Sequence, residues 1–341
     1  MPPSIKDVAK KARVSTATVS LVVHNHERIS AATRKRVLKA IADLNYRPSR
    51  NARRLVTKKT RNIGFLLTND HFLRTEPFYT HIFLGTEFEA RDHEYYVLLN
   101  TISEHFQERD KLPRFVLENT VDGIIIAGKI PDNIVPNLEV FQIPLVFVDY
   151  YPPNNNKYPK VLIDNVNGGI DATQHLIDHG HRKIGFIGGD INHPSIRDRL
   201  QGYKIALKKA GIKFNDRYLY ATETSTNRSS GYHAAQELLN KDADITALFA
   251  CNDAMAIGAM QCFKENGFSI PKDISIIGFD DVTADLYTDP RLSSMNVPKV
   301  ELGIQATRMI IDMMDKNVNG SKQVLVPVQI VARDSVTEIS G

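Results

Sequence analysis

Residues 4–23 read SIKDVAKKARVSTATVSLVV, two amphipathic stretches joined by a very short connection. Ser4 and Asp7 have the spacing of a capping box, and apolar residues then recur with the period of a helix. Ser15 can cap a second helix, whose inner face carries Val19 and two further valines. The stretch therefore predicts two short helices that cross closely.

A third helix follows at Ser30, another residue that favours a helix N-terminus. Val37 would face inward in it, while Arg34, Lys35 and neighbouring basic residues would form its outer surface. Short polar side chains open the second helix, and the turn before it is short. Both features fit a helix-turn-helix unit, in which the N-terminus of the second helix enters the DNA major groove.

Charge divides the chain unevenly. The first 61 residues hold sixteen Lys and Arg against three Asp and Glu, a formal charge of +13, whereas the remaining 280 have a formal charge of −9. A duplex phosphate backbone suits such a basic segment, because each cation placed on a phosphate releases condensed counterions. Charge alone leaves a solvated basic face as the alternative.

Composition favours a protein with a large core and more than one domain, since the chain has 341 residues and 42% apolar content. Its N-terminus lacks the apolar stretch of a signal peptide, and no apolar run approaches the roughly 18 residues that span a bilayer. We therefore expect a cytoplasmic protein without a membrane partner. Cys251 and Cys262 are expected to be buried, reduced thiols.

From residue 62 on, β-rich apolar runs alternate with helical stretches. The runs are Ile63–Leu67, Tyr95–Leu99, Gly123–Ala127, Leu145–Val148, Val161–Ile163, Ile184–Ile187, Leu248–Ala250 and Ile274–Ile277. Such alternation is typical of α/β folds, in which helices cover both faces of parallel sheets. A change of rhythm at about residues 150–165 predicts two doubly wound lobes.

Polar residues directly follow several of these strands. They are Asp149, Asn252 with Asp253, and Asp280 with Asp281. Ligands in open parallel sheets bind outside the carboxyl ends of the strands, so these side chains are candidates for a binding site. Each could instead have a local role: Asn252 or Asp253 as a helix cap, Asp280 in a turn, and Asp149 as a loop acid.

The sequence gives no support for an enzymatic function. The sequence has no G-x-S-x-G, H-E-x-x-H or P-loop motif, and residues 185–189 lack the dinucleotide fingerprint. His175, His179 and His181 lie close in sequence, but no Cys or carboxylate completes a ligand set, so they are interpreted as surface or helix-end residues. We expect no metal, no cofactor and no catalytic residue.

The N-terminal motifs resemble the DNA-binding headpiece of the lac-repressor (LacI/GalR) family: Ile5-Lys6-Asp7-Val8-Ala9, Val14-Ser15-Thr16-Ala17-Thr18-Val19-Ser20, Ile29-Ser30, Thr33-Arg34 and Leu44-Asn45-Tyr46-Arg47-Pro48. The resemblance implies that residues 49–55 form a hinge helix, which folds on DNA and inserts Leu55 into the minor groove. It implies DNA contacts by Thr16, Ala17, Thr18, Leu21, Ser30, Arg34, Ser49, Ala52 and Leu55.

The resemblance continues through the body, which is similar to the family's effector domain of periplasmic-binding-protein type. It is carried by Glu76-Pro77-Phe78-Tyr79, Gly180-His181-Arg182, Arg199-Leu200-Gln201-Gly202-Tyr203, Asn252-Asp253-Ala254-Met255-Ala256 and Gly278-Phe279-Asp280-Asp281. It implies that an effector contacts Phe78, Tyr79, Asp149, Arg199, Asn252 and Asp280. The chain departs from the family pattern at Thr226, where many relatives have an aromatic residue, and at Leu292-Ser293-Ser294.

These observations together predict a headpiece at residues 1–47, a hinge and linker at 48–61, and a two-lobed body at 62–341. The lobes are expected at about 62–160 plus 292–320, and at about 161–291 plus 321–341. The predicted function is a homodimeric transcriptional repressor that binds a near-palindromic operator under the control of a small ligand, expected to be a sugar. A corepressor-dependent repressor, an activator and a solute-binding protein are the alternatives.

Overall fold

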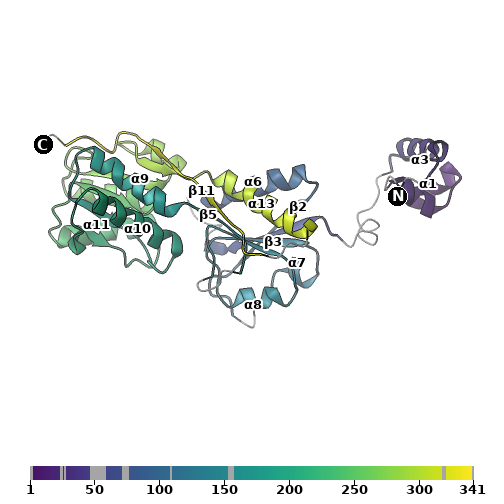
Figure 1. The fold of residues 1–341 in the computed structure, drawn as a ribbon, viewed down its shortest axis with the longest axis horizontal. Coiled ribbons are helices and arrows are strands. Elements are labelled where there is room, and N and C mark those ends of the chain that lie inside the picture. Colours follow the sequence, from purple (N-terminus) through teal and green to yellow (C-terminus); the bar gives the residue numbers. More distant parts are fainter. Residues whose placement is uncertain are drawn as a thin grey trace. The chain divides into compact units, whose positions relative to one another are not determined.

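The structure, a computed structural model, describes residues 3–23, 26, 28–46, 59–70, 77–107, 110–152, 157–316 and 320–339. The chain divides into two compact units, residues 1–60 and 61–341, and Figure 1 shows the elements of each.

The N-terminal unit contains the three predicted helices, α1 (Ile5–Ala12), α2 (Thr16–Val23) and α3 (Ala31–Asp43). Ser4 and Asp7 form the predicted capping box at the start of α1. Ser15 and Ser30 each accept a hydrogen bond from the backbone N–H three residues further on, at 3.1 and 3.3 Å. The helices bury a small common core, in which Val8, Val19 and Val37 are completely enclosed.

The first lobe of the larger unit is built on a parallel sheet with strand order β11-β5-β4-β3-β1-β2. Its strands are β1 (Asn62–Thr68), β2 (Tyr96–Ile102), β3 (Gly123–Ala127), β4 (Leu145–Val148), β5 (Lys160–Ile163) and β11 (Gln323–Val326). Helices α6 (Phe78–Asp92) and α13 (Lys299–Lys316) cover one face, and α7 (Arg114–Leu117) and α8 (Ile134–Glu139) lie on the other (Figure 1).

The second lobe has a sheet of order β12-β10-β9-β8-β6-β7, which is parallel except for the pairing of β12 with β10. Its strands are β6 (Ile184–Ile187), β7 (Leu219–Tyr220), β8 (Ala247–Ala250), β9 (Ser275–Asp280), β10 (Ser293–Asn296) and β12 (Gln329–Val331). Helix α9 (Asn165–Asp178) packs against α10 (Pro194–Lys209), and α11 (Arg228–Asn240) against α12 (Asp253–Glu265). Short 3₁₀ helices occupy Asp216–Tyr218 and Thr283–Tyr287.

Strand β3 shows why the sheets are covered on both faces. All five of its residues are buried, and they alternate between two apolar clusters. Ile124 and Ile126 contact the cluster beneath α7 and α8, whereas Ile125 and Ala127 belong to the cluster on the opposite face. A strand with apolar side chains on both sides has to lie between two layers of helices.

The chain passes between the lobes three times, from β5 to α9, from β10 to α13 and from β11 to β12. The expected lobe limits are therefore wrong at three strands. β5 and β11 belong to the first sheet, and β10 to the second, because each pairs with strands of that sheet. Apolar pattern identifies a strand but not its neighbours, so sequence could not place these crossings.

Candidate functional site

Helix α2 carries four of the residues expected to contact DNA. Thr16 and Ala17 are exposed, Thr18 is half-buried, and Leu21 is 37% exposed although it is apolar. This leaves small and apolar groups at the N-terminal end of a helix that carries no acidic residue in its first turn. That end can approach a polyanion without charge repulsion.

The other expected DNA contacts divide into two groups. Ser30 caps α3 and stays exposed, and half-buried Arg34 donates from Nη2 to the carbonyl oxygen of His26 at 2.8 Å. Ser49, Ala52 and Leu55, expected in the hinge, lie outside the described residues.

A cavity of about 480 Å³ opens among the carboxyl ends of strands from both lobes. All six residues expected to contact an effector line it: Phe78 and Tyr79 at the start of α6, Asp149 after β4, Arg199 in α10, Asn252 after β8 and Asp280 at the end of β9. Phe78 and Tyr79 pack edge to face, with ring centroids 5.1 Å apart. Glu76, the first residue of their motif, lies outside the described residues.

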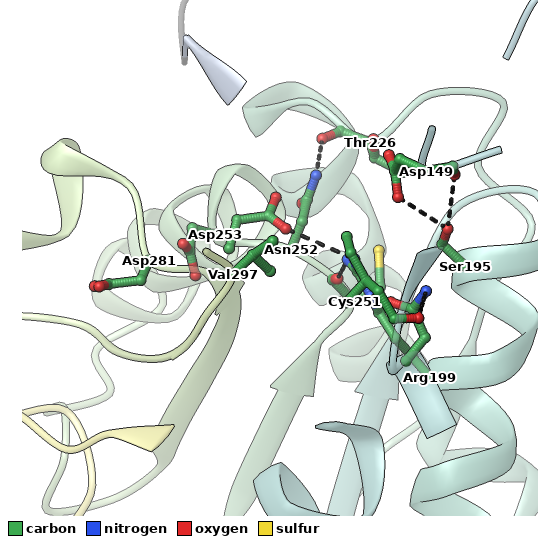
Figure 2. A network of polar contacts seen from close by, with 12 residues as sticks. Asp149, Ser195, Arg199, Thr226, Cys251, Asn252, Asp253, Asp281 and Val297 are labelled. Atoms are coloured by element: carbon green, nitrogen blue, oxygen red, sulfur yellow. Dashed lines mark hydrogen bonds and ion pairs between the residues drawn. The ribbon is translucent and has the colours of Figure 1, made fainter. Parts of the chain in front are cut away.

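Arg199 is fixed on several sides at the floor of this cavity (Figure 2). Its Nη1 donates to the carbonyl oxygen of Cys251 at 2.6 Å, and its Nε donates to Asn165 Oδ1 at 2.8 Å. The guanidinium lies 3.7 Å from the centre of the Phe279 ring, and Nη2 is 3.7 Å from Asp280 Oδ1. A buried cation held this way has little freedom to turn.

Asp149 accepts hydrogen bonds from hydroxyl groups of both lobes. The Tyr79 hydroxyl donates to its Oδ2 at 2.9 Å, and the Ser195 hydroxyl lies 3.4 Å from both Oδ1 and the backbone oxygen (Figure 2). Asp149 has a positive φ of 61° and is only 6% exposed. Its carboxylate is thus positioned at the wall of the cavity.

Asn252 caps a helix and also lines the cavity. Its Oδ1 accepts from the Met255 N–H at 2.9 Å and caps α12, while Nδ2 donates to the carbonyl oxygen of Thr226 at 2.9 Å. The second Nδ2 hydrogen leaves the amide able to donate into the cavity that it lines.

A strained turn carries Asp280 into the cavity. Asp280 and Asp281 have φ angles of 118° and 53°, a region that favours glycine. Lys299, at the start of α13 in the first lobe, donates from Nζ to the carbonyl oxygens of both residues. Arg333 donates to Asp281 Oδ1 at 2.5 Å. Two cations therefore stabilise the backbone conformation that positions Asp280.

Behind this turn lies a buried pair of carboxyl groups, Asp253 and Asp285, both 0% exposed. Both accept a hydrogen bond from the N–H of Val282, each at 3.1 Å, and Ser294 donates to Asp253 at 2.6 Å. Burial, and then repulsion by Asp285, raises the pKa of Asp253 well above its usual range. Burial also raises the pKa of Asp285 to about 7. The pair is therefore expected to share a proton at neutral pH.

Several lining residues were not anticipated, among them Thr68, Asp132, Asp190, His193 and Ser195. Thr68 is the last residue of β1, and Asp190 follows β6 after two glycines, so the strand-end rule applied to every strand would have pointed to both. Asp132 lies further along the loop after β3, where the rule does not reach. His193 and Ser195 flank the first residue of α10, and no pattern in the sequence singles them out.

The histidine cluster does not form a metal site. Within the described residues, no group of three or more His, Cys, Asp or Glu is arranged to hold a metal ion. His175 and His179 lie at the end of α9, as expected, and burial lowers the pKa of His175 to about 4. The expectation is wrong for His181, which is buried between Thr246 Oγ1 and the carbonyl oxygen of Thr337.

Two further expectations concern the cysteines and the membrane. Cys251 and Cys262 are both buried and free of a disulfide, as predicted. None of the helices in the described ranges is long and apolar enough to cross a membrane.

Both units of the chain match families of known proteins. Residues 4–49 match the profile of the lacI family of bacterial regulatory proteins, and residues 173–336 match a periplasmic binding protein-like domain. The ribose operon repressor of Haemophilus influenzae is 34% identical over 95% of each chain. The repressor CytR of Escherichia coli is 32% identical over 97% of this chain and 96% of its own.

Solved structures agree with this likeness. A lac repressor dimer bound to operator and the anti-inducer ONPF covers 99% of this chain and 100% of its own, with a TM-score of 0.78 and 25% identity. A complex of the regulator CelR with cellobiose has a TM-score of 0.73 and 28% identity over 98% and 99% of the two chains. The chain belongs to the lacI family of bacterial regulatory proteins: it is a DNA-binding transcriptional repressor with a ligand-binding domain, and not an enzyme.

Proposed function

We propose that the protein is a cytoplasmic homodimer that represses transcription from a near-palindromic operator, and that a sugar or sugar derivative in the cavity controls its operator affinity. The observation that supports the ligand site most directly is that all six residues expected to contact a ligand line one cavity. Three connections join the two lobes, so a ligand that touches both can change their relative angle. The change would reach the DNA-binding unit through residues 48–61.

We further propose that the headpiece comprises residues 1–47 and the body 62–341. Thr16, Ala17 and Leu21 would contact base edges, because all three are exposed on α2. Replacing Thr16 or Ala17 should then change base preference by about 1–3 kcal/mol at one symmetric pair of positions. Lys35→Ala should weaken binding to all sequences alike, because its ammonium group would contact only phosphate.

Named relatives support the ligand class without fixing the ligand. A ribose operon repressor, a CelR complex with cellobiose and a LacI-family regulator with bound ribose are all similar to this chain, and so is a repressor named PurR. A sugar is therefore the first class to test, and a purine the second.

The test is a thermal-shift screen of monosaccharides, oligosaccharides and purines, followed by operator titration with each hit. A ligand at 100-fold its Kd adds about 2.7 kcal/mol of stability, which gives a readily measured shift. We expect the hit to weaken operator binding, and therefore to bind less tightly to the DNA-bound form. A hit that strengthens operator binding would establish corepression instead. A protein that binds no operator, with or without a hit, would contradict the proposal.

A further inference from the structure

We propose that Lys299 is a positioning residue that pins the two lobes together at one side of the cavity, so that they rotate about this point. The inference rests on the proposed function, since this rotation is taken to be what a ligand in the cavity controls. Lys299 itself does not line the cavity. It would therefore act on the response to a ligand without touching the ligand.

The Lys299 side chain is buried, and its ammonium group is held by backbone carbonyl groups. Nζ donates to the carbonyl oxygen of Asp280, to that of Asp281 at 3.2 Å and to that of Val297 at 3.3 Å. Three bonds use all three hydrogens of an ammonium group. Within the described ranges no carboxylate forms an ion pair with Lys299, so these carbonyl groups are its main partners.

A cation is an unfavourable choice at this position for the stability of α13. Lys299 is the first residue of the helix, where the helix dipole favours negative groups, and burial removes its ammonium group from water. An apolar residue would avoid both costs. Lysine adds instead two charged hydrogen bonds to carbonyl groups at the end of β9, a strand of the other lobe. The link between lobes therefore explains this residue better than the helix does.

On the first-lobe side, Lys299 belongs to a pair of tightly packed helices that carries one wall of the cavity. Arg308 of α13 donates twice to the Glu89 carboxylate of α6, at 2.8 and 3.1 Å. Helix α6 begins with Phe78, a cavity residue whose ring centre lies 5.8 Å from Lys299 Nζ. The ammonium group and this wall should therefore move together.

The turn after β9 is fixed in the same way to the second lobe. Asp281 donates from its N–H to Ser294 Oγ at 3.0 Å, and its carboxylate accepts from Arg333 at 2.5 Å. Ser294 lies in β10, and Arg333 follows β12, both strands of the second sheet. Asp280, one residue earlier, lines the cavity. The ammonium group thus joins the cavity wall of one lobe to the cavity wall of the other.

A weaker contact joins the lobes elsewhere on the cavity. The Ser195 hydroxyl of the second lobe lies 3.4 Å from two oxygen atoms of Asp149 in the first, well apart from Asp281 and Val297 (Figure 2). Hydrogen bonds of this length are weak. When a ligand enters, the Ser195 contact should change first while the Lys299 bonds hold. The lobes would then rotate about the Lys299 side, as in hinge closure.

The first measurement needs no effector. Lys299→Met keeps a long, unbranched side chain and removes the ammonium group. Tyr203→Phe is the matched control, because it also removes a buried donor to a carbonyl oxygen, that of Ile184 at 2.7 Å, but within the second lobe alone. Spin labels on Val140→Cys in the first lobe and Asn240→Cys in the second report the distance between lobes. Both positions are exposed, and the native cysteines are buried.

The doubly labelled chain is co-expressed with an unaltered chain and purified through a tag on one of them, which keeps the measured distances within one protomer. We expect Lys299→Met to broaden the distance distribution and Tyr203→Phe to leave it as in the parent protein. A merely structural role would lower the unfolding temperature of both variants and leave both distributions unchanged. That result would overturn the inference and leave the proposed function standing.

Lys299→Gln serves in the same measurement if Lys299→Met does not fold. Its amide keeps two donor hydrogens without the charge, and the distribution should again be broader than in the parent protein. A folded Lys299→Gln variant with the parent distribution would also overturn the inference.

The second arm measures how ribose, glucose, cellobiose and adenine change operator affinity. For each compound, the ratio of operator affinities without and with it is determined in each variant, which cancels any effect of the variant on operator binding alone. The ratio should fall from the roughly 5–150-fold of typical allosteric coupling towards one in Lys299→Met, and persist in Tyr203→Phe. A ratio preserved in Lys299→Met would contradict the inference. If no compound changes operator binding by the parent protein, this counts against the proposed function, while the distances still decide the role of Lys299.

Discussion

Asp253 and Asp285 are the residues whose protonation the fold constrains most tightly. Two carboxyl groups that share one backbone N–H in a dry site cannot both be ionised at low cost. Arg333 Nη1 is the nearest cation to Asp285, at 3.8 Å, but Arg333 also pairs with Asp281. One proton therefore belongs to the folded turn beside the cavity.

This proton makes stability depend on pH. The pKa of Asp285 in the folded state is raised to about 7, above the usual value of 3.8 for an unfolded aspartate. Between these values the folded chain keeps a proton that the unfolded chain has lost. For Asp285 alone, the free energy of unfolding should thus fall as pH rises from about 4 to 7, by at most about 1.4 kcal/mol per pH unit, and Asp253, whose pKa is also raised, should add to the fall.

Asp285→Asn should make this decline shallower, because the amide carries no titrating proton and only Asp253 of the pair is left to titrate. Urea unfolding at pH 5, 6, 7 and 8 measures it, with exposed Asp92→Asn as the control that keeps the decline. An identical pH profile in Asp285→Asn and the parent protein would show that no proton is shared.

Arg199 and Asp280 allow a second test at this scale. Arg199→Ala and Asp280→Ala should each abolish the response to effector and preserve operator binding without it, since both residues belong to the larger unit and not to the unit that contains α2. The expected loss of effector affinity is on the order of 2–5 kcal/mol, as for a charged partner removed from a desolvated site. Calorimetry with the identified effector measures it.

The matched control is Arg197→Ala, which removes an exposed arginine from the same helix. Full ligand affinity in both pocket variants would place the effector elsewhere. Loss of operator binding in both would indicate a corepressor-dependent or damaged protein.

At the scale of elements, helix α6 depends on an unusually close approach by α13. A Cβ atom on Gly303 would lie 2.0 Å from the carbonyl oxygen of Ile82 and 2.6 Å from the backbone nitrogen of Thr86. Neither backbone atom can move without shifting α6. Gly303→Ala should therefore destabilise the protein by about 1–3 kcal/mol, as overpacking does elsewhere.

Thermal or urea unfolding measures this cost, with Gly320→Ala as the control, because a Cβ there would meet nothing within 4 Å. A Gly303→Ala variant as stable as the control would mean that the two helices can separate freely.

The hinge carries another prediction at this scale. Leu55→Ala should leave folding and dimerisation intact but reduce operator affinity and DNA bending, because Leu55 is expected to act only as a wedge between bases. Bending is measured by the distance between fluorophores at the operator ends, and dimerisation by sedimentation. Hydrogen exchange of residues 49–55 should also slow on operator binding. Unchanged bending would reject the wedge.

The sequence predicted helices that are capped by nearby residues and strands that are made of apolar residues. It missed strands whose polar residues are held by partners far away in the sequence. The caps Ser4, Ser15 and Ser30 were evident because their partners lie within three residues. β10 was missed because it begins with two serines, which are buried only because Ser335 and Asp253 bond to them. β7, β11 and β12 were missed because they are two to four residues long and largely exposed or half-buried.

The candidate site shows the same division. The six expected ligand residues could be named from strand ends and family motifs. The supports behind them, such as Asn165 beside Arg199 and Lys299 beside Asp280, could not, because Asn165 lies on a different helix 34 residues before Arg199 and Lys299 lies beyond a chain crossing. Their roles follow from the three-dimensional arrangement alone.

For the whole molecule, the separation of charge along the chain predicts how DNA binding depends on salt. The basic N-terminal 61 residues and the acidic remainder should make operator affinity fall steeply with salt. A plot of log affinity against log salt concentration, from fluorescence anisotropy, should have a slope steeper than about −5, as several phosphate contacts per subunit require. A slope near zero would exclude the phosphate backbone as a main partner.

The three crossings between the lobes also determine how the protein can be made. β11 completes the first sheet from residues 323–326, and β12 completes the second only a few residues later. A nascent chain on the ribosome therefore cannot finish either lobe until nearly all of the sequence has emerged. The N-terminal unit is contiguous within residues 1–60, so it can fold during translation, before the rest of the chain has been made.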